Sequence, residues 1–407
     1  MKRIEKDFEV INLITEKGLG INRLSYTKYE RKAINYIKEE CVKADMSVKI
    51  DNCGNLIARR EGIDSKTSAV ATGSHLDTVY EGGKYDGTVG VLAGIEAIRN
   101  LKDKNIRTKR PIELIVFACE ESSRFGISTL GSKAMTGKVN FDKIRNIKDK
   151  DDITIEEAYQ KIGLDINKTK NCIREKDSIK SFLELHIEQS PYLERDELDV
   201  GIVTGISAPT RFNVKIKGLA EHSGSTRMFE RQDALVGASK IVLAVKKFAE
   251  EESKNSTVGT VGTLRVKPGA INVIPGYTEL KIDIRGIIKE SIDRVCDNII
   301  KYFGTLEEEL KLVVNWEIIS NEMPILTDKT IQNTLEKNSK KLGLKYTYMN
   351  SGAGHDAMNM AKIWPTGMIF IPSKKGISHN PKEFTDLSYI KKGARLLEET
   401  LVELANF

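Results

Sequence analysis

The feature that most constrains the fold of this chain is a short apolar run that ends in a histidine. Residues 69–72 read Ala-Val-Ala-Thr, which is typical of a buried strand, and they lead directly into Gly73-Ser-His75. Open α/β sheets bind their ligands at the carboxyl ends of the strands. The pattern therefore predicts that His75 lies at this edge of a sheet and takes part in ligand binding.

The residues after His75 have the composition of a metal-binding loop. Asp77 follows two positions later, and a metal-bound imidazole usually donates its second N–H to a carboxylate. Asp86 lies in the glycine-rich stretch 82–87, where small residues permit close backbone approach and positive φ. A surface loop with scattered acidic residues is the alternative interpretation, because His-x-Asp alone is a common pattern.

The placement of the histidines favours the metal interpretation. All five lie in stretches rich in Gly, Glu or Asp, and none lies on a plain amphipathic helix face. They are His75, His186, His222, His355 and His379. Chance placement would not produce this pattern, so each histidine is a candidate for chemistry.

Two further predicted strands bring acidic residues to the same kind of position. Residues 112–118 form a nearly continuous apolar run and are followed directly by Cys119, Glu120 and Glu121. Neighbouring side chains at a strand end point differently, so one carboxylate can bind a metal while the other faces a water. A Glu pair bridged to Arg124 is the simpler structural alternative.

Residues 181–189 alternate as a strand does, and this pattern places Glu184, His186 and Glu188 on one face. Predicted strands and helices alternate along the first part of the chain. This order predicts an α/β fold in which helices cover both faces of the sheet.

Length and composition limit the classes of protein to consider. A chain of 407 residues exceeds the usual size of one core, so we expect two domains. The net charge of +6 is spread evenly without a basic block, which argues against nucleic-acid binding. The five cysteines are widely spaced, as in reduced cytoplasmic proteins. No apolar run is long enough for a membrane span, so we expect a cytoplasmic protein without a membrane partner.

The order of predicted elements changes near residue 211. From there it reads strand, helix, strand, strand, helix, strand, which is the order of a small ferredoxin-like α+β unit. The earlier alternation returns after this unit. The sequence therefore predicts one domain from residues 1–209 and 325–407, interrupted by an inserted domain of residues 210–324.

The candidate residues suit metal-dependent hydrolysis. Imidazoles and carboxylates without cysteine favour zinc, manganese, cobalt or nickel, and three histidines with two carboxylates make a dinuclear site. Two cations can polarise a carbonyl and lower the pKa of a water. The chain lacks a G-x-S-x-G motif, a P-loop, and a G-x-G-x-x-G motif after a strand.

Seven stretches, in order over nearly the whole chain, resemble the hydantoinase/carbamoylase amidases of the dinuclear metallopeptidase superfamily. They read GSHLDTVYEGGKYDG, EESSRFG, ELHIEQ, EHSGSTRM, INVIPG, SGAGHDA and SHNPKE. The resemblance implies an α/β, mixed-sheet catalytic domain with an inserted ferredoxin-like lid and dimerisation domain. It also implies a homodimer built through that inserted domain.

The resemblance implies roles for individual residues. Two divalent ions per subunit, with Zn²⁺ expected first and Mn²⁺, Co²⁺ or Ni²⁺ as alternatives, would be held by His75, Asp86, Glu121, His186 and His379. The implied catalytic residues are Glu120 as the general base, Asp77 and His222. The implied substrate contacts are Gln189, Asn272, Arg285, Gly352, Ala353 and His355. A structural role for His355, and a pairing of Arg285 with Asp283, remain alternatives.

We therefore expect an amidohydrolase that cleaves the ureido C–N bond of a small carboxylate-bearing molecule. An N-carbamoyl-L-amino acid is the first choice, and allantoate or 3-ureidopropionate is the alternative. A dipeptidase or aminoacylase is more distant. A non-catalytic metal- or ligand-binding protein is the competitor from another class, and Glu120 argues against it.

Overall fold

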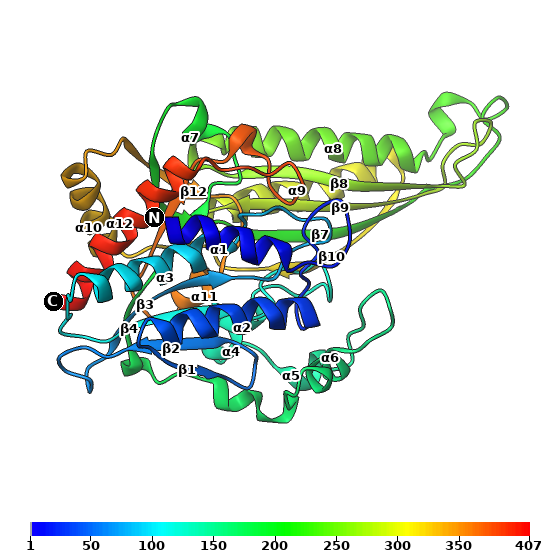
Figure 1. The fold of residues 1–407 in the computed structure, drawn as a ribbon. Coiled ribbons are helices and arrows are strands. Elements are labelled where there is room, and N and C mark those ends of the chain that lie inside the picture. Colours follow the sequence, from blue (N-terminus) through cyan, green and yellow to red (C-terminus); the bar gives the residue numbers. More distant parts are fainter. Residues whose placement is uncertain (1) are drawn as a thin grey trace. The chain divides into compact units, whose positions relative to one another are not determined.

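The computed structural model describes residues 2–407, and the chain forms two compact units (Figure 1). The first unit contains the residues up to Thr204 together with Thr327–Met349 and His355–Phe407. The second contains Gly205–Leu326 and Asn350–Gly354. The segment 210–324, which the sequence predicts as an insertion, falls within the second unit.

A mixed sheet forms the centre of the first unit. Its strands lie in the order β1 (Ser47–Ile50), β2 (Leu56–Arg60), β4 (Ile112–Phe117), β3 (Ala69–His75), β5 (Ile179–Ile187), β13 (Thr366–Ile371) and β6 (Val200–Ile206). The four strands β4, β3, β5 and β13 are parallel, and the flanking strands pair antiparallel. The short strands β11 (Ile325–Leu326) and β12 (Tyr346–Ser351) also pair with β6. The predicted mixed α/β fold is thus confirmed, and the parallel strands end at a common edge.

Helices bury the apolar side chains of this sheet. One core joins the sheet to α1 (Lys2–Leu13), α2 (Lys28–Lys43), α3 (Thr88–Asp103), α10 (Lys329–Lys341) and α12 (Leu387–Asn406). The shorter helices α4 (Leu130–Met135) and α11 (Asp356–Met360) contact each other, and α11 also contacts β5 and β13. Because α3 begins directly after Asp86, its packing fixes where the glycine-rich loop ends.

The stretch between residues 138 and 180 is not a simple surface segment, although its high lysine content is typical of one. It contains α5 (Phe141–Ile144), α6 (Ile155–Lys161) and a 3-10 helix (Ile166–Cys172). Tyr159 is buried, and its ring centroid lies 4.7 Å from that of Tyr26. The lysines lie among apolar residues that form a small separate core, so composition alone is misleading here.

The second unit has the element order that the sequence predicts. Its antiparallel sheet has the spatial order β10 (Val313–Asn321), β7 (Ala208–Lys217), β9 (Tyr277–Gly286) and β8 (Val258–Lys267). The helices α8 (Ala234–Glu251) and α9 (Lys289–Leu310) pack on this sheet. Alternate residues of β7, namely Phe212, Val214 and Ile216, are buried against them, as expected for a strand with one covered face.

Two further observations concern the helices and the cysteines of the described chain. Across residues 2–407, no helix has both the length and the apolar character needed to cross a membrane. All five cysteines are free and buried.

The buried cation of Arg23 ties α1, which the sequence analysis did not predict, to the strand ends. Its Nη1 donates to the carbonyl oxygens of Ile11 (2.8 Å) and Ile14 (3.2 Å). Its Nε donates to the carbonyl of Leu76 (2.6 Å), and its Nη2 donates to the hydroxyl of Thr88 (3.0 Å). Burial lowers the pKa of Arg23 to about 10, so the side chain stays charged at neutral pH.

Replacing Arg23 should destabilise the first unit. Arg23→Met leaves buried carbonyl oxygens without donors, and each unsatisfied buried group costs about 1–3 kcal/mol. We expect the free energy of unfolding to fall by at least about 3 kcal/mol, measured by chemical denaturation. The control is Arg195→Met at the end of α7 (Tyr192–Arg195), an exposed arginine paired with its neighbour Asp196, which should change stability by less than about 0.5 kcal/mol. Equal effects of the two substitutions would contradict this interpretation.

Candidate metal centre

The carboxylate of Asp86 lies among three of the predicted imidazole ligands. Its Oδ1 lies 3.1 Å from His186 Nε2 and 3.5 Å from His75 Nε2. Its Oδ2 lies 3.2 Å from His379 Nε2. His75 ends β3 and His186 lies in β5, whereas His379 lies in the loop between β13 and α12. One side chain thus faces ligands from three separate segments.

The structure places the five predicted metal ligands in two groups that share Asp86. The ligand atoms of each group lie within 4.8 Å of one another. The groups are His75, Asp86 and His186, and Asp86, Glu121 and His379. The first group is buried, while the side chain of His379 is 49% exposed. The geometry therefore provides one enclosed and one more open position.

A third cluster, Glu184, His186 and His355, is also compact, but its carboxylate is already engaged. Glu184 Oε1 accepts the hydroxyl of Ser74 (2.8 Å), and Oε2 accepts the backbone N–H of Ala357 (2.9 Å). The ring of His355 packs edge-on against that of His186, with centroids 4.5 Å apart. Burial lowers the pKa of His355 well below its ordinary value, so the ring is neutral. These contacts favour a packing role for His355.

Backbone carbonyls orient the two imidazoles that stand on strands. His75 Nδ1 lies 2.9 Å from the carbonyl oxygen of Asp77, and His186 Nδ1 lies 2.9 Å from that of Ile187. Both rings therefore direct Nε2 toward Asp86. The His-x-Asp pattern predicts the Asp77 carboxylate as the partner of His75, but that carboxylate lies farther from Nδ1, at 3.6 Å.

The Asp77 carboxylate instead holds the backbone of the two adjacent acids. It accepts the N–H groups of Glu120 (3.2 Å) and Glu121 (3.0 Å) and the hydroxyl of Ser25 (2.7 Å). The residue before the acids, Cys119, has a φ of 53°. Asp77 thus supports a left-handed turn that sends the two carboxylates in different directions.

The pKa values of the two adjacent acids, Glu120 and Glu121, are both raised. Burial raises the pKa of Glu120 well above its ordinary value, although nearby His75 opposes the shift. Burial, with Asp86 adding to it, raises the pKa of Glu121 to about 7. The Glu120 carboxylate lies 3.7 Å from His75 Nε2. A buried carboxyl of this kind in a ligand-lined site is a candidate proton carrier.

Two residues of the surrounding loops complete the centre. Gln189 donates from Nε2 to Asp86 Oδ2 (2.7 Å), and its Oε1 is buried without a hydrogen-bond partner in the described part of the chain. Gly87 has a φ of +62°, and a Cβ there would lie 2.5 Å from the His75 ring. Only glycine fits this position, because the loop passes directly against a ligand.

The remaining predicted residues lie in the second unit, in two places. His222 is exposed, and Asn272 lies beside it, because the carbonyl of Asn272 accepts the N–H of Ser223 (3.0 Å). Their loops are joined by a bridge between His222 and Val273.

The second place surrounds Arg285. Its Nε and Nη2 donate to Asp283 (2.6 and 3.2 Å), and its Nη1 donates to the carbonyl of Gly352 (3.3 Å). The structure thus brings Arg285 to the predicted Gly352 and Ala353 segment. The alternative partner Asp283 is also present, on one side of the guanidinium.

Sequence reasoning missed the supporting side chains Ser25, Ser378 and Glu383. Glu383 ends the stretch SHNPKE, which also contains the predicted ligand His379. This position in the motif is the available signal, but the role of Glu383 depends on contacts with a distant loop.

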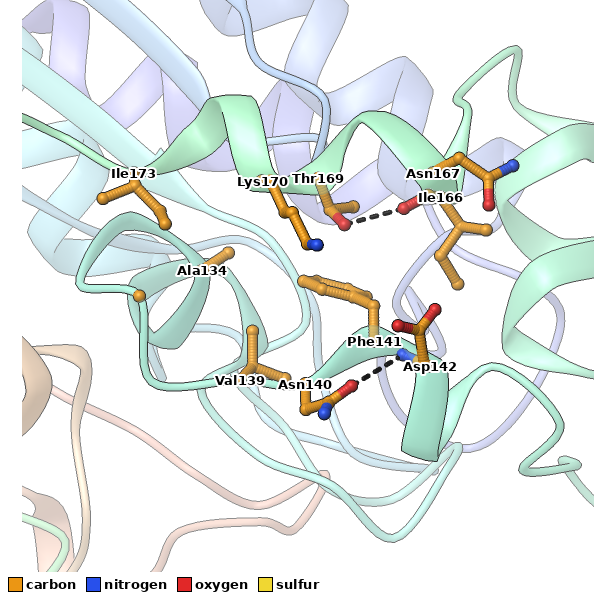
Figure 2. Close-up of a pocket in the computed structure, with 11 residues that line it drawn as sticks. Ala134, Val139, Asn140, Phe141, Asp142, Ile166, Asn167, Thr169, Lys170 and Ile173 are labelled. Carbon is orange, nitrogen blue, oxygen red and sulfur yellow. Dashed lines mark hydrogen bonds between the residues drawn. The ribbon is translucent and has the colours of Figure 1, made fainter.

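A hollow elsewhere in the first unit shows that shape alone does not identify the site. It has a volume of about 540 Å³ and lies between α4 and the 3-10 helix Ile166–Cys172 (Figure 2). Phe141, Ile166 and Lys170 are among the residues that line it. None of the predicted site residues belongs to it.

Comparisons with known sequences identify the family of this chain. The family model described as peptidase family M20/M25/M40 matches residues 71–403. An uncharacterized hydrolase of Haemophilus influenzae is 44% identical over 405 residues, which cover 100% of this chain and 98% of the relative. An N-carbamoyl-L-amino-acid amidohydrolase of Pseudomonas sp. is 37% identical, covering 95% and 94%. A ureidoglycolate hydrolase of Oryza sativa subsp. japonica is 38% identical, covering 95% and 81%.

Comparison with solved structures indicates the same family. A solved amidase of the hydantoinase/carbamoylase family from Burkholderia multivorans matches with a TM-score of 0.93 and 30% identity, covering 100% of this chain and 98% of that chain. The resemblance seen in the sequence is therefore confirmed. The chain belongs to peptidase family M20/M25/M40 and is a hydrolase of the amidase type that acts on C–N bonds other than peptide bonds.

Proposed function

We propose that this protein hydrolyses the ureido C–N bond of an N-carbamoyl-L-amino acid. One water is consumed, and the free amino acid, ammonia and carbon dioxide are formed. The observation that carries the proposal is the pair of ligand groups joined at Asp86, with the buried carboxylate of Glu120 beside them. The name of the Pseudomonas relative supports the substrate class.

The donor atoms fit two divalent ions. Three imidazoles and two carboxylates without a thiol suit Zn²⁺, Mn²⁺, Co²⁺ or Ni²⁺. The Oε1 atom of Gln189 has no hydrogen-bond partner among the described residues, although its Nε2 donates to Asp86. A metal ion or substrate bound beside Asp86 would give this buried oxygen a polar partner. The first group, His75 with Asp86 and His186, would hold one ion, and the second group would hold the other. Bound ions would supply Lewis acidity to the substrate carbonyl and to water.

Glu120 carries the protons in this proposal. Its carboxylate takes a proton from the attacking water and returns it to the leaving nitrogen, which departs as ammonia. A raised pKa allows the carboxyl to hold that proton near neutral pH between the two transfers. Asp77 keeps the backbone of Glu120 in place, so it supports this role without touching the substrate.

Arg285 binds the substrate carboxylate in this proposal, with help from Asn272 and Gln189. Asp283 occupies the Nε and Nη2 side of the guanidinium, and Nη1 donates to the carbonyl of Gly352 in a longer bond of 3.3 Å, so the substrate carboxylate would take the place of that carbonyl at Nη1. His222 has a separate catalytic role, in which it reaches the metal site of the other subunit and stabilises the oxyanion there. We also infer that the second unit serves as a lid and forms the contact of a cytoplasmic homodimer. The family resemblance supports this role.

A second candidate reaction uses the same chemistry on a different ureido compound. The rice relative is named ureidoglycolate hydrolase, and ureidoglycolate also carries a carboxylate on the carbon that bears the ureido nitrogen. Allantoate and 3-ureidopropionate remain alternatives of the same type.

A substrate panel tests the proposed function. Protein loaded with Zn²⁺ or Mn²⁺ should release ammonia fastest from N-carbamoyl-L-amino acids when compared with ureidoglycolate, allantoate, 3-ureidopropionate and a dipeptide. Removal of the metal by a chelator should abolish release, and adding the ion back should restore it. Faster turnover of ureidoglycolate would support the second candidate. Full activity of the metal-free protein would contradict the metal centre.

Glu120→Gln should separate proton transfer from binding. The amide keeps the size of the side chain but cannot accept the proton, so kcat should fall by roughly 10²–10⁴. The metal content and the substrate affinity should stay close to those of the wild type. A variant with near-normal kcat would show that another group is the base.

Arg285→Lys should weaken substrate recognition. Lysine keeps the charge but loses the planar fork, and a charge-assisted hydrogen bond contributes about 1.5–3 kcal/mol. We expect kcat/KM to fall by about one to two decades, with metal content unchanged. The control is Arg211→Lys, because Arg211 also donates to Asp283 (2.7 Å) but has no assigned substrate contact. A carboxamide analogue cleaved by the wild type as well as the acid would contradict carboxylate binding by Arg285.

A further inference from the structure

Glu383 has a buried carboxylate beside the metal ligands but no role in the reaction proposed above. It is only 3% exposed. Its Oε1 accepts the backbone N–H groups of Tyr85 (2.8 Å) and Asp86 (3.1 Å), and its Oε2 accepts the hydroxyl of Ser378 (2.9 Å). These bonds join the loop of one ligand to the loop of another, across a sequence separation of 297 residues between Asp86 and Glu383.

The hydroxyl of Ser378 faces two carboxylates at once. It lies 2.9 Å from Glu383 Oε2 and 2.9 Å from Asp86 Oδ2. A hydroxyl has one hydrogen, so it donates to one of these carboxylates at a time. The next residue, His379, has a φ of 53°, a left-handed conformation that is uncommon for a residue other than glycine. The contacts of Ser378 therefore help to hold the backbone that presents this imidazole.

The glycine-rich loop is shaped around Glu383. A Cβ at Gly83 would lie 2.1 Å from the carboxyl carbon of Glu383, so no larger residue fits without displacing it. The carboxylate thus fills the inside of the loop that ends at Asp86. Movement of either loop would break hydrogen bonds that are shielded from water, which is costly.

The two ligand groups depend on these loops to different degrees. His75 and His186 stand on the paired strands β3 and β5, and their rings are oriented by nearby carbonyls. His379 stands on a loop, and its group reaches Asp86 only when the two loops lie together.

We propose that Glu383 is the positioning residue of the second ligand group, Asp86, Glu121 and His379. It fixes the loop of His379 against the loop of Asp86 and so sets the distance between these ligands. The inference rests on the two-metal site proposed above. It assigns Glu383 no contact with the substrate.

Glu383→Gln is the test. The amide has the same size, but its NH₂ group must face either the two backbone N–H groups or the hydroxyl of Ser378, which disrupts the clamp. Metal-free protein is titrated with Zn²⁺ in competition with a chromophoric chelator. We expect the second ion to bind about 10–100-fold more weakly, the usual effect of losing an outer hydrogen-bond partner, while the first ion binds as in the wild type.

Glu252→Gln is the matched control. Glu252 accepts the hydroxyl of Ser291 (2.7 Å) and the Nε (2.7 Å) and Nη2 (2.8 Å) of Arg294, so it joins the end of α8 to α9 within the second unit, whereas the ligands belong to the first. The change should lower the melting temperature of the metal-free protein and leave both Zn²⁺ affinities unchanged. The same result for Glu383→Gln would indicate a purely structural role and overturn the proposal.

The outcomes distinguish a failure of the two-metal site from a failure of the role proposed for Glu383. If the wild type binds fewer than two Zn²⁺ ions, the two-metal site itself is wrong. If the wild type binds two ions and Glu383→Gln binds both normally, or loses both alike, the role of Glu383 is wrong. Should Glu383→Gln fail to fold, Ser378→Ala decides instead, and an unchanged affinity for the second ion would overturn the proposal.

Discussion

The arrangement of this centre depends on one buried carboxylate that faces three imidazoles. Burial raises the pKa of Asp86, but His186, His379 and His75 together hold it well below its ordinary value, so the side chain is ionised. A buried charge is costly unless it is paired and hydrogen-bonded. The chain satisfies this requirement with ligands from β3, β5 and a distant loop, and with the amide of Gln189.

Strands and loops contribute differently to the centre. The parallel pairing of β3 with β4 and β5 brings His75, Glu120 and His186 to neighbouring positions, since parallel strands end at the same edge. Side chains on strands are placed more rigidly than those on loops. Asp86 and His379 stand on loops, so side chains outside the ligand set must stabilise them. Asp77 provides similar support to the backbone of Glu120.

The sequence predicted much of the fold because the signals are local. Apolar runs located β3 and β4, and alternation located β5, to within a few residues. The predicted order of elements after residue 211 also matches that of the second unit. The helix α1 could not be predicted in this way, because acids and bases are mixed along it and its attachment depends on the buried Arg23. The small core around Tyr159 has no clear signal either, because the surrounding segment is rich in lysine.

The candidate ligands were recognised from residue types and motif order, and the structure brings them together. Their hydrogen-bond partners could not be predicted in the same way. The partner of His75 is a backbone carbonyl, which has no signature in the sequence. Glu383 bonds to residues 297 and 298 positions earlier, and only the folded chain shows which loop it meets.

This long separation has a consequence for biosynthesis. Chains fold progressively from the N-terminus as they are made. His75, Asp86 and His186 are synthesised early, whereas the ligand group that includes His379 cannot exist until the ribosome has passed Glu383. A nascent chain would therefore display only the first of its two ligand groups, although four of the five candidate ligands have already been synthesised.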